Sequence, residues 1–199
     1  MAELNIMIGF PGSGKSNYAK KYLLINNSVY LSSDDIRIEL YGFEDQTHND
    51  VVFETMKKRT LNALRDGKDV IYDATNLSKK RRSGIISEAR KLSAQINAYL
   101  CCTPINIILE RNITRVERQL PWDKLVQMIQ SIEPPMYYEG FDNSSYILLS
   151  NEWLYTAITR AKKMCYLITQ TKAFNMAVLH HKTVDRNTFL LELLKKENK

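Results

Sequence analysis

The sequence has few cysteines and no long apolar run, and these absences exclude several classes of protein. Its three cysteines, Cys101, Cys102 and Cys165, show neither metal-ligand spacing nor a disulfide framework. No apolar run approaches the roughly 20 residues that a membrane-spanning helix requires. The N-terminus also lacks a basic and then apolar segment, the pattern of a secretory signal. We therefore expect an intracellular, cytoplasmic protein that has no membrane partner.

The positive charge of the chain is concentrated near its C-terminus. The whole sequence has a formal net charge of +6, but residues 1–143 contain 19 Lys and Arg against 18 Asp and Glu. Residues 144–199 contain 9 against 4. A basic composition is typical of nucleic-acid binding. Because the first part is nearly neutral, charge alone does not identify its substrate.

The first two-thirds of the sequence alternate between strand-like and helix-like segments. Strands are expected near residues 4–8, 28–31, 69–76 and 96–102, and helices near residues 15–24, 49–64 and 78–93. This order predicts an α/β fold with a parallel sheet flanked by helices. Two further helical segments follow at 105–115 and 121–132, and the proline- and glycine-containing stretch 133–145 is the best candidate boundary. The predicted division is 1–142 and 143–199, the second part being a small α/β appendage.

The stretch "GFPGSGKS" matches the phosphate-binding pattern G-x-x-x-x-G-K-[ST] and follows a predicted strand. Glycines allow such a loop to turn its backbone N–H groups towards phosphate oxygens. Lys15 can reach the β- and γ-phosphates, and the Ser16 hydroxyl can bind Mg²⁺. The pattern predicts a P-loop NTPase-type fold that binds ATP and Mg²⁺. The expected cofactor-binding residues are Gly9, Gly12, Ser13, Gly14, Lys15 and Ser16.

A second candidate site is "SSDDIR", at the end of the second predicted strand. Strand carboxyl ends face the ligand crevice of an open parallel sheet. An aspartate there can accept the proton of an attacking hydroxyl while Arg37 holds a phosphate. Alternatively, Ser33 or Asp34 caps the following helix and Asp35 complements its dipole. The two interpretations are compatible.

A third candidate is "VIYDATNLSKKRR". Asp73 follows a buried run, where a carboxylate can be directed towards Mg²⁺. Thr75 and Asn76 can contact a phosphate or cap the next helix. The four basic residues at the start of that helix form either a solvated face or a site that attracts a polyanion.

The fourth candidate, "ERNITRVERQLP", places Arg111, Arg115 and Arg118 on one helical face. Such arginines can form a helical lid that neutralises charge on a transferred phosphoryl group. Alternatively, they pair with Glu110 and Glu117 on the surface.

Together these four motifs resemble the kinase domain of phage-type polynucleotide 5′-kinases and related small P-loop kinases, over about residues 1–142. The resemblance implies that Lys15 and Ser16 bind ATP·Mg²⁺ and that Asp34 is the general base. It also implies that Arg37 holds the acceptor's phosphate and that Thr75 orients the acceptor. Arg111 and Arg115 would be lid arginines. Asn17 departs from the threonine common in the family, and no phosphatase motif follows, so we do not expect 3′-end trimming.

Residues 148–194 resemble the C-terminal motif-six region of superfamily-one DNA helicases, with Arg160 in "YTAITRAKK" as the matching arginine. The other helicase motifs are absent between Lys15 and Arg160, so we expect no working motor. The segment can instead be an appendage that buries Trp153, Leu167 and Phe189.

Three functions are consistent with these patterns, and the family resemblance implies the first of them. The first is ATP-dependent phosphorylation of a nucleic acid 5′-hydroxyl, with DNA or RNA as partner. The second is phosphorylation of a small-molecule hydroxyl, and the third is nucleic-acid-stimulated ATP hydrolysis. The patterns do not predict an oligomeric state.

Overall fold

The computed structural model describes residues 1–25, 27–42, 47–114 and 119–147. By its contacts the chain divides into two compact units, Met1–Leu148 and Leu149–Lys199. All described residues belong to the first unit. The helicase-like segment, with Arg160, lies outside the described residues, as does the predicted lid residue Arg115.

Five parallel strands form the sheet, in the order β2-β3-β1-β4-β5. Their bounds are β1 Glu3–Ile8, β2 Ser28–Ser32, β3 Asp69–Asp73, β4 Gln95–Cys101 and β5 Asn143–Ile147. β1 is the middle strand of this order, and both faces of its apolar segment are covered. Leu4, Ile6 and Ile8 belong to one core cluster, whereas Met7 belongs to another. This two-sided burial explains why the strand reads as a continuous apolar run rather than an alternating one.

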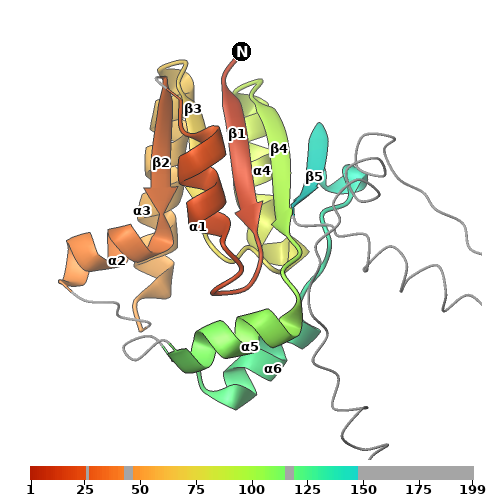
Figure 1. The fold of residues 1–199 in the computed structure, drawn as a ribbon. Helices are drawn as coiled ribbons and strands as arrows, with labels where there is room; N and C mark the ends of the chain where they lie inside the picture. Colours follow the sequence, from red (N-terminus) through yellow and green to blue (C-terminus); the bar gives the residue numbers. More distant parts are fainter. Residues whose placement is uncertain (26, 43–46, 115–118, 148–199) are drawn as a thin grey trace, which may run out of the picture. The chain divides into compact units, whose positions relative to one another are not determined.

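Helices cover both faces of the sheet, as the sequence predicts (Figure 1). The bounds are α1 Lys15–Tyr18, α2 Ser33–Tyr41, α3 Asn49–Arg65, α4 Lys79–Lys91, α5 Ile105–Thr114 and α6 Trp122–Gln130. On one face, Met56 of α3 and Ile86 of α4 pack in the cluster that contains Ile6. On the other face, Ala19 packs with Met7 and the neighbouring strands.

The first helix differs from the expected single α-helix over residues 15–24. It is an α-helix only from Lys15 to Tyr18 and continues as a π-helix, η1, over Ala19–Leu23. Leu24 has extended backbone angles and ends the element. The apolar pattern of 15–24 indicated a helix but does not distinguish these two hydrogen-bond registers.

The helices α5 and α6 lie beyond the carboxyl ends of β1 and β4 (Figure 1). Ile108 of α5 and Leu125 of α6 pack with Phe10, which belongs to the glycine loop, and with Leu77. Pro121 precedes α6 as its N-cap rather than occupying its first turn. The predicted helical lid is therefore present and is anchored on the loop by apolar contacts.

The sheet extends past the predicted boundary at Asp142. A short 3₁₀ helix, η2 (Tyr137–Glu139), precedes β5, and β5 pairs with β4 from Asn97↔Asn143 to Cys101↔Ile147. The division after Asp142 stays a prediction about function, but the folded unit continues beyond it.

No helix within the described residues is long and apolar enough to cross a bilayer.

Candidate functional site

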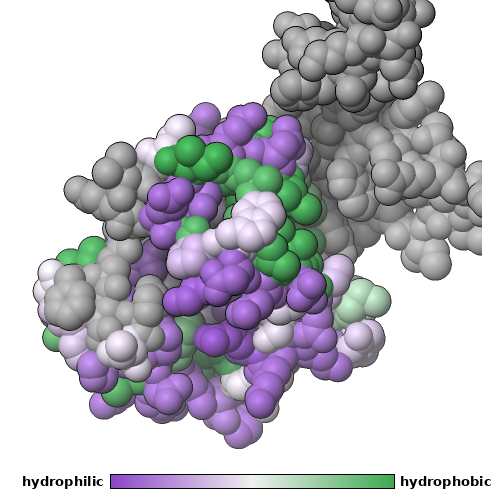
Figure 2. Space-filling model, turned by 90° about the horizontal axis from the view of Figure 1, so that it is seen from below, coloured by the Kyte–Doolittle hydropathy of each residue, from purple (hydrophilic) through white to green (hydrophobic). Residues whose placement is uncertain are grey.

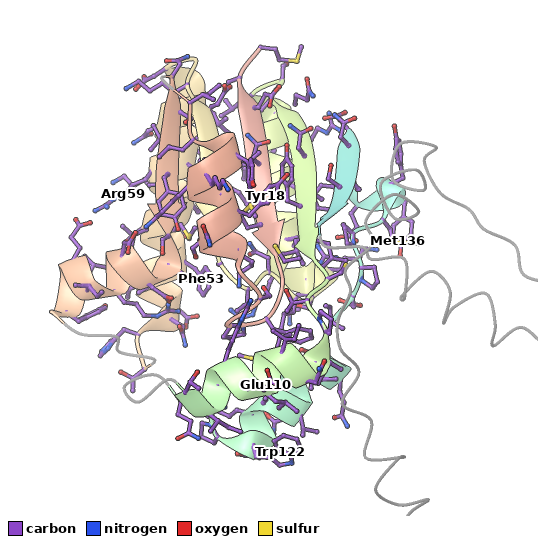
Figure 3. The ribbon with its side chains drawn as sticks, in the orientation of Figure 1. Tyr18, Phe53, Arg59, Glu110, Trp122 and Met136 are labelled. Carbon is purple, nitrogen blue, oxygen red and sulfur yellow. The ribbon has the colours of Figure 1, made fainter. Side chains whose placement is uncertain are left out.

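Three of the predicted motifs follow neighbouring strands at one edge of the sheet. The glycine loop follows β1, Asp73–Asn76 end and follows β3, and Ser32–Arg37 link β2 to α2. Parallel strands place their carboxyl ends at the same edge, where ligands bind in open α/β sheets. The fold therefore collects the candidate residues at one place, with α5 on the far side of the edge (Figure 3).

The glycine loop has the backbone that its sequence requires. Gly12 and Gly14 have φ values of 83° and 87°, in the left-handed region that side chains disfavour. Gly9 is fixed by space as well, because a Cβ there would lie 2.8 Å from the Ser13 hydroxyl and 3.2 Å from Cys101. The Gly9 N–H donates to the Thr75 carbonyl, which connects this loop to the segment after β3.

The loop side chains fit a triphosphate ligand. The Lys15 ammonium is buried and donates to the Phe10 carbonyl at 2.9 Å, so it lies across the inside of the loop. The Ser13 hydroxyl is buried without a hydrogen-bond partner, which is costly unless a ligand satisfies it. The Ser13 carbonyl accepts from Thr103, which fixes the loop from the side of β4. The oxygens of a phosphate chain would supply negative charge for the buried Lys15 and a hydrogen-bond acceptor for the Ser13 hydroxyl.

Asp34 and Arg37 form an ion pair at the end of β2. The Arg37 Nη1 donates to Asp34 Oδ1 at 2.8 Å, and its Nη2 donates to the Asn49 Oδ1 at 2.7 Å. The Arg37 side chain is only 6% exposed, whereas that of Asp34 is 50% exposed. Arg37 Nε is buried and has no hydrogen-bond partner. The pair thus combines an accessible carboxylate with a guanidinium that is held rigidly beside it.

The N-cap of α2 is neither of the two predicted residues, Ser33 and Asp34. The N-cap is Ser32, whose hydroxyl accepts from the N–H groups of Asp34 and Asp35. Ser33 is the first helical residue, and Asp34 lies in the first turn, where its side chain pairs with Arg37 instead of capping. Because Ser32 caps the helix, the Asp34 carboxylate is not needed as its cap.

Asp73 has a partner that the sequence did not indicate. The Tyr30 hydroxyl, from β2, donates to Asp73 Oδ2 at 2.6 Å. Burial and the hydrogen bond to Asp73 together raise the pKa of Tyr30. Tyr30 thus holds the Asp73 carboxylate in one orientation. A single tyrosine in a strand belongs to no recognisable motif. Only knowledge of the register between β2 and β3 could have predicted that Tyr30 lies beside Asp73.

This donor set fits Mg²⁺ better than a metal bound by protein ligands alone. Among the described residues, no group of three His, Cys, Asp or Glu side chains can hold a metal ion. Ser16 and the buried Asp73 together offer one hydroxyl and one carboxylate. Mg²⁺ is typically bound by one or two such ligands together with phosphate oxygens and water.

Thr75 and Asn76 have different surroundings. Asn76 is buried, has a φ of 48°, and donates from its side-chain amide to the Met7 carbonyl at 2.7 Å. These contacts indicate a structural role and do not support the predicted contact with an acceptor phosphate. Thr75 is only partly buried and stays a candidate. Neither residue caps α4, whose N-cap is Ser78.

The four basic residues that begin α4 do not form one surface. Arg82 is fully buried and forms a bidentate ion pair with Glu139. Lys79 lies 4.3 Å from the centre of the Tyr138 ring. Arg81 lies instead over Phe53 of α3. Arg82 is thus structural, whereas Lys79 and Arg81 contact different aromatic rings.

The lid contributes one described arginine to the loop. The Arg111 Nη1 donates to the Gly12 carbonyl at 2.7 Å, so the predicted lid arginine does lie against the glycine loop. Seen from the side of α5 and α6, the described surface is mostly hydrophilic, with hydrophobic patches between the polar areas (Figure 2). The lid presents an apolar face to Phe10, and its exposed side includes the hydrophobic side chains of Ile105, Ile113 and Trp122.

The two described cysteines are unsuited to nucleophilic chemistry. Burial raises the pKa of Cys101 to about 12 and that of Cys102 to about 11. A thiol with such a pKa is protonated at neutral pH, and the thiolate is the reactive form. The site chemistry therefore rests on the carboxylates, hydroxyls and cations described above.

Comparison with known proteins agrees with this geometry. A family model described as an AAA domain, AAA_33, matches residues 4–135. This range contains the glycine loop and both lid helices. It does not reach the helicase-like segment, for which the comparisons give no support.

Two curated relatives are kinases by name. An L-seryl-tRNA(Sec) kinase of Methanococcus maripaludis is 25% identical over 137 residues, which are 66% of this chain and 53% of that protein. A protein of Acanthamoeba polyphaga mimivirus, provisionally named a bifunctional polynucleotide phosphatase/kinase, is 35% identical over 74 residues, 37% of this chain and 14% of that protein. The chain thus spans about half of one relative and a small part of the other.

A solved structure, that of a Pnkp1/Rnl/Hen1 complex, has a chain that is 25% identical with a TM-score of 0.51. The match covers 62% of this chain and 42% of that one. Since the family model spans well over half of the sequence, the chain belongs to the AAA_33 family of AAA domains.

Proposed function

We propose that this protein transfers the γ-phosphoryl group of ATP to the 5′-hydroxyl of a nucleic acid. The observation that carries the proposal is the Asp34–Arg37 pair, an accessible carboxylate fixed by a buried guanidinium at the same sheet edge as the glycine loop. A phosphotransferase needs a base for the acceptor hydroxyl, whereas an ATP-binding module does not. The relative named for polynucleotide phosphatase/kinase activity supports the choice of acceptor.

In the proposed reaction the Asp34 carboxylate accepts the proton of the 5′-hydroxyl. The hydroxyl oxygen forms a bond to the γ-phosphorus, the bond between that phosphorus and the β,γ-bridging oxygen breaks, and ADP leaves. Arg37 holds the carboxylate in place and contributes positive charge beside the acceptor. Lys15 and Arg111 lie at the glycine loop, where positive charge stabilises the phosphoryl group in transfer.

Ser16 and Asp73 are the residues that would hold Mg²⁺. The ion, when bound, would neutralise charge on the phosphate oxygens of the nucleotide. Tyr30 fixes the orientation of the Asp73 carboxylate for this role. We assign Thr75 to the acceptor side and, by resemblance, Arg115 to the lid with Arg111.

The test is phosphoryl transfer from labelled ATP to an oligonucleotide with a 5′-hydroxyl. Loss of a general base typically reduces the rate by about 10²–10⁴-fold, so Asp34→Asn is expected to lose transfer while its affinity for ATP is unchanged. Asp35→Asn is the matched control, because Asp35 is the next residue and is exposed. Transfer by Asp34→Asn at the wild-type rate would exclude Asp34 as the base.

A second acceptor class follows from the relative named as an L-seryl-tRNA(Sec) kinase. A panel of acceptors separates it from the first: 5′-hydroxyl DNA, 5′-hydroxyl RNA, nucleosides, sugars and serine esters. Transfer to a small hydroxyl compound with none to oligonucleotides would replace the proposed acceptor. ATP hydrolysis that rises with added DNA, without any phosphorylated acceptor, would instead favour a nucleic-acid-stimulated ATPase.

A further inference from the structure

We propose that Arg81 is a further arginine for the phosphates of the acceptor strand, beside Arg37, to which the family resemblance already gives such a role, with Phe53 as the support that aligns the two. This inference rests on the proposed function and specifies its acceptor. It assigns the substrate to hydroxyl compounds that carry phosphodiester groups next to the hydroxyl, and not to free sugars or nucleosides.

The first observation is that both guanidinium groups lie against one aromatic ring. The Arg37 Cζ is 5.9 Å and the Arg81 Cζ is 5.3 Å from the centre of the Phe53 ring. Phe53 belongs to the first turns of α3, at the end of that helix closest to α2 and to the carboxyl edge of the sheet (Figure 3). Cations held near a ring face are attracted to it. The ring therefore brings together two arginines that come from α2 and α4.

The second observation is that the positive charge of this cluster is only partly compensated. Arg37 pairs with Asp34 and Asn49, yet its Nε is buried without a hydrogen-bond partner. Among the described residues, the Arg81 guanidinium forms neither a hydrogen bond nor an ion pair, and Arg81 is exposed. A planar guanidinium has five N–H donors suited to phosphate. Arg81 thus offers donors to a ligand while Phe53 fixes its position.

The third observation is position. Arg37 contacts the carboxylate that we assign as general base, so the cluster begins at the place where the acceptor hydroxyl must lie. A hydroxyl at the end of a strand is followed by phosphodiester groups at regular intervals. In the proposed site Arg37 lies next to the first of these groups, and Arg81, whose guanidinium lies near the same ring, reaches the same phosphate or the next one.

The test measures binding of a 3′-labelled single-stranded oligonucleotide with a 5′-hydroxyl, by fluorescence anisotropy over a series of KCl concentrations. Each phosphate contact on a single strand contributes about 0.7 to the slope of log K against log [salt]. Arg81→Ala is expected to reduce that slope by about 0.7 and to raise the KM for the oligonucleotide about tenfold, with the KM for ATP unchanged. Lys80→Ala removes an adjacent exposed charge and is expected to change neither the salt slope nor the KM for the oligonucleotide.

Neutral linkages locate the contact. Oligonucleotides with a methylphosphonate at the first or at the second linkage lack the charge of that phosphate. Arg81→Ala should lose its effect on one of them, because the contact is already absent. Phe53→Leu should weaken binding in the same direction, and thermal melting verifies that each variant is folded.

Three outcomes oppose the inference. If Arg81→Ala keeps the wild-type salt slope, Arg81 binds no phosphate. If Arg81→Ala weakens the binding of both methylphosphonate substrates as much as that of the unmodified strand, Arg81 contributes only general positive charge and contacts neither phosphate. If the wild-type protein phosphorylates thymidine as well as it phosphorylates an oligonucleotide, the neighbouring phosphates are not recognised. By contrast, failure of the wild-type protein to phosphorylate any oligonucleotide in the transfer assay would refute the proposed function itself.

Discussion

At the scale of single residues, Tyr30 orients Asp73, one of the two side chains that we assign to the metal ion. Its hydroxyl donates to Asp73 Oδ2 at 2.6 Å. Removing such a supporting contact typically weakens metal affinity by about 10–100-fold. We expect Tyr30→Phe to require more Mg²⁺ for half-maximal transfer while its affinity for metal-free ATP stays unchanged.

Titration of Mn²⁺ by paramagnetic resonance, in the presence of ADP, measures this affinity without turnover. Tyr22→Phe is the control, because Tyr22 is an exposed tyrosine of η1. An unchanged Mn²⁺ affinity in Tyr30→Phe would show that Asp73 does not depend on this bond, or that it does not bind the metal.

The role of a single residue could be predicted from the sequence where that residue belongs to a recognisable motif. Gly9, Gly14 and Lys15 occupy fixed positions of the loop pattern, and the structure gives both glycines a positive φ and buries Lys15. Tyr30 and Phe53 act through contacts between elements that are distant in the sequence. Such contacts depend on strand order and helix packing, which no local spacing reveals.

At the scale of elements, Arg82 fastens the segment after the lid to the segment after β3. Its Nη1 donates to the carbonyls of Leu77 and Glu133, and its other nitrogens pair with Glu139. Both side chains are almost completely buried, with exposures of 0% for Arg82 and 3% for Glu139. Breaking a buried pair by removing one charge leaves the other uncompensated.

We therefore expect Glu139→Gln to destabilise the protein by about 3–5 kcal/mol. The midpoint of urea unfolding, followed by tryptophan fluorescence and circular dichroism, measures the change. Glu88→Gln is the matched control, because it removes the partner of Lys91 in a solvent-accessible i,i+3 pair, which contributes little to stability. Equal midpoints for the two variants would show that the buried pair does not hold this region together.

The same region shows why helix positions were easier to predict than the roles of their side chains. The apolar periodicity of residues 78–93 predicts α4 correctly. The run of four basic residues within it indicates a charged face. Arg82 is nevertheless buried, because it pairs with Glu139, which lies 57 positions further along the chain. Periodicity records which residues face the core only where those residues are apolar.

At the scale of the whole molecule, β5 marks where the first folded unit ends. β5 completes the sheet beside β4, and Asp142, which precedes it, accepts from the Ile96 N–H and from Arg90. These bonds lower the pKa of Asp142. The sequence placed the boundary in the proline-rich stretch before β5, because that stretch has the composition of a linker, whereas strand pairing connects it to the sheet.

We expect a chain that ends at residue 148 to retain ATP binding and phosphoryl transfer, because it contains the whole first compact unit. A chain that ends at residue 142 lacks β5 and exposes the edge of β4, whose buried residues include Ile96 and Leu100. Unpaired apolar edges promote aggregation. The shorter chain should melt roughly 5–10 °C lower, as expected for the loss of a few kcal/mol from a domain of this size. Thermal melting with and without ATP·Mg²⁺, and light scattering, measure both effects. Identical melting of the two chains would show that β5 is not integral to the unit, and loss of transfer in the longer chain would assign a function to residues 149–199.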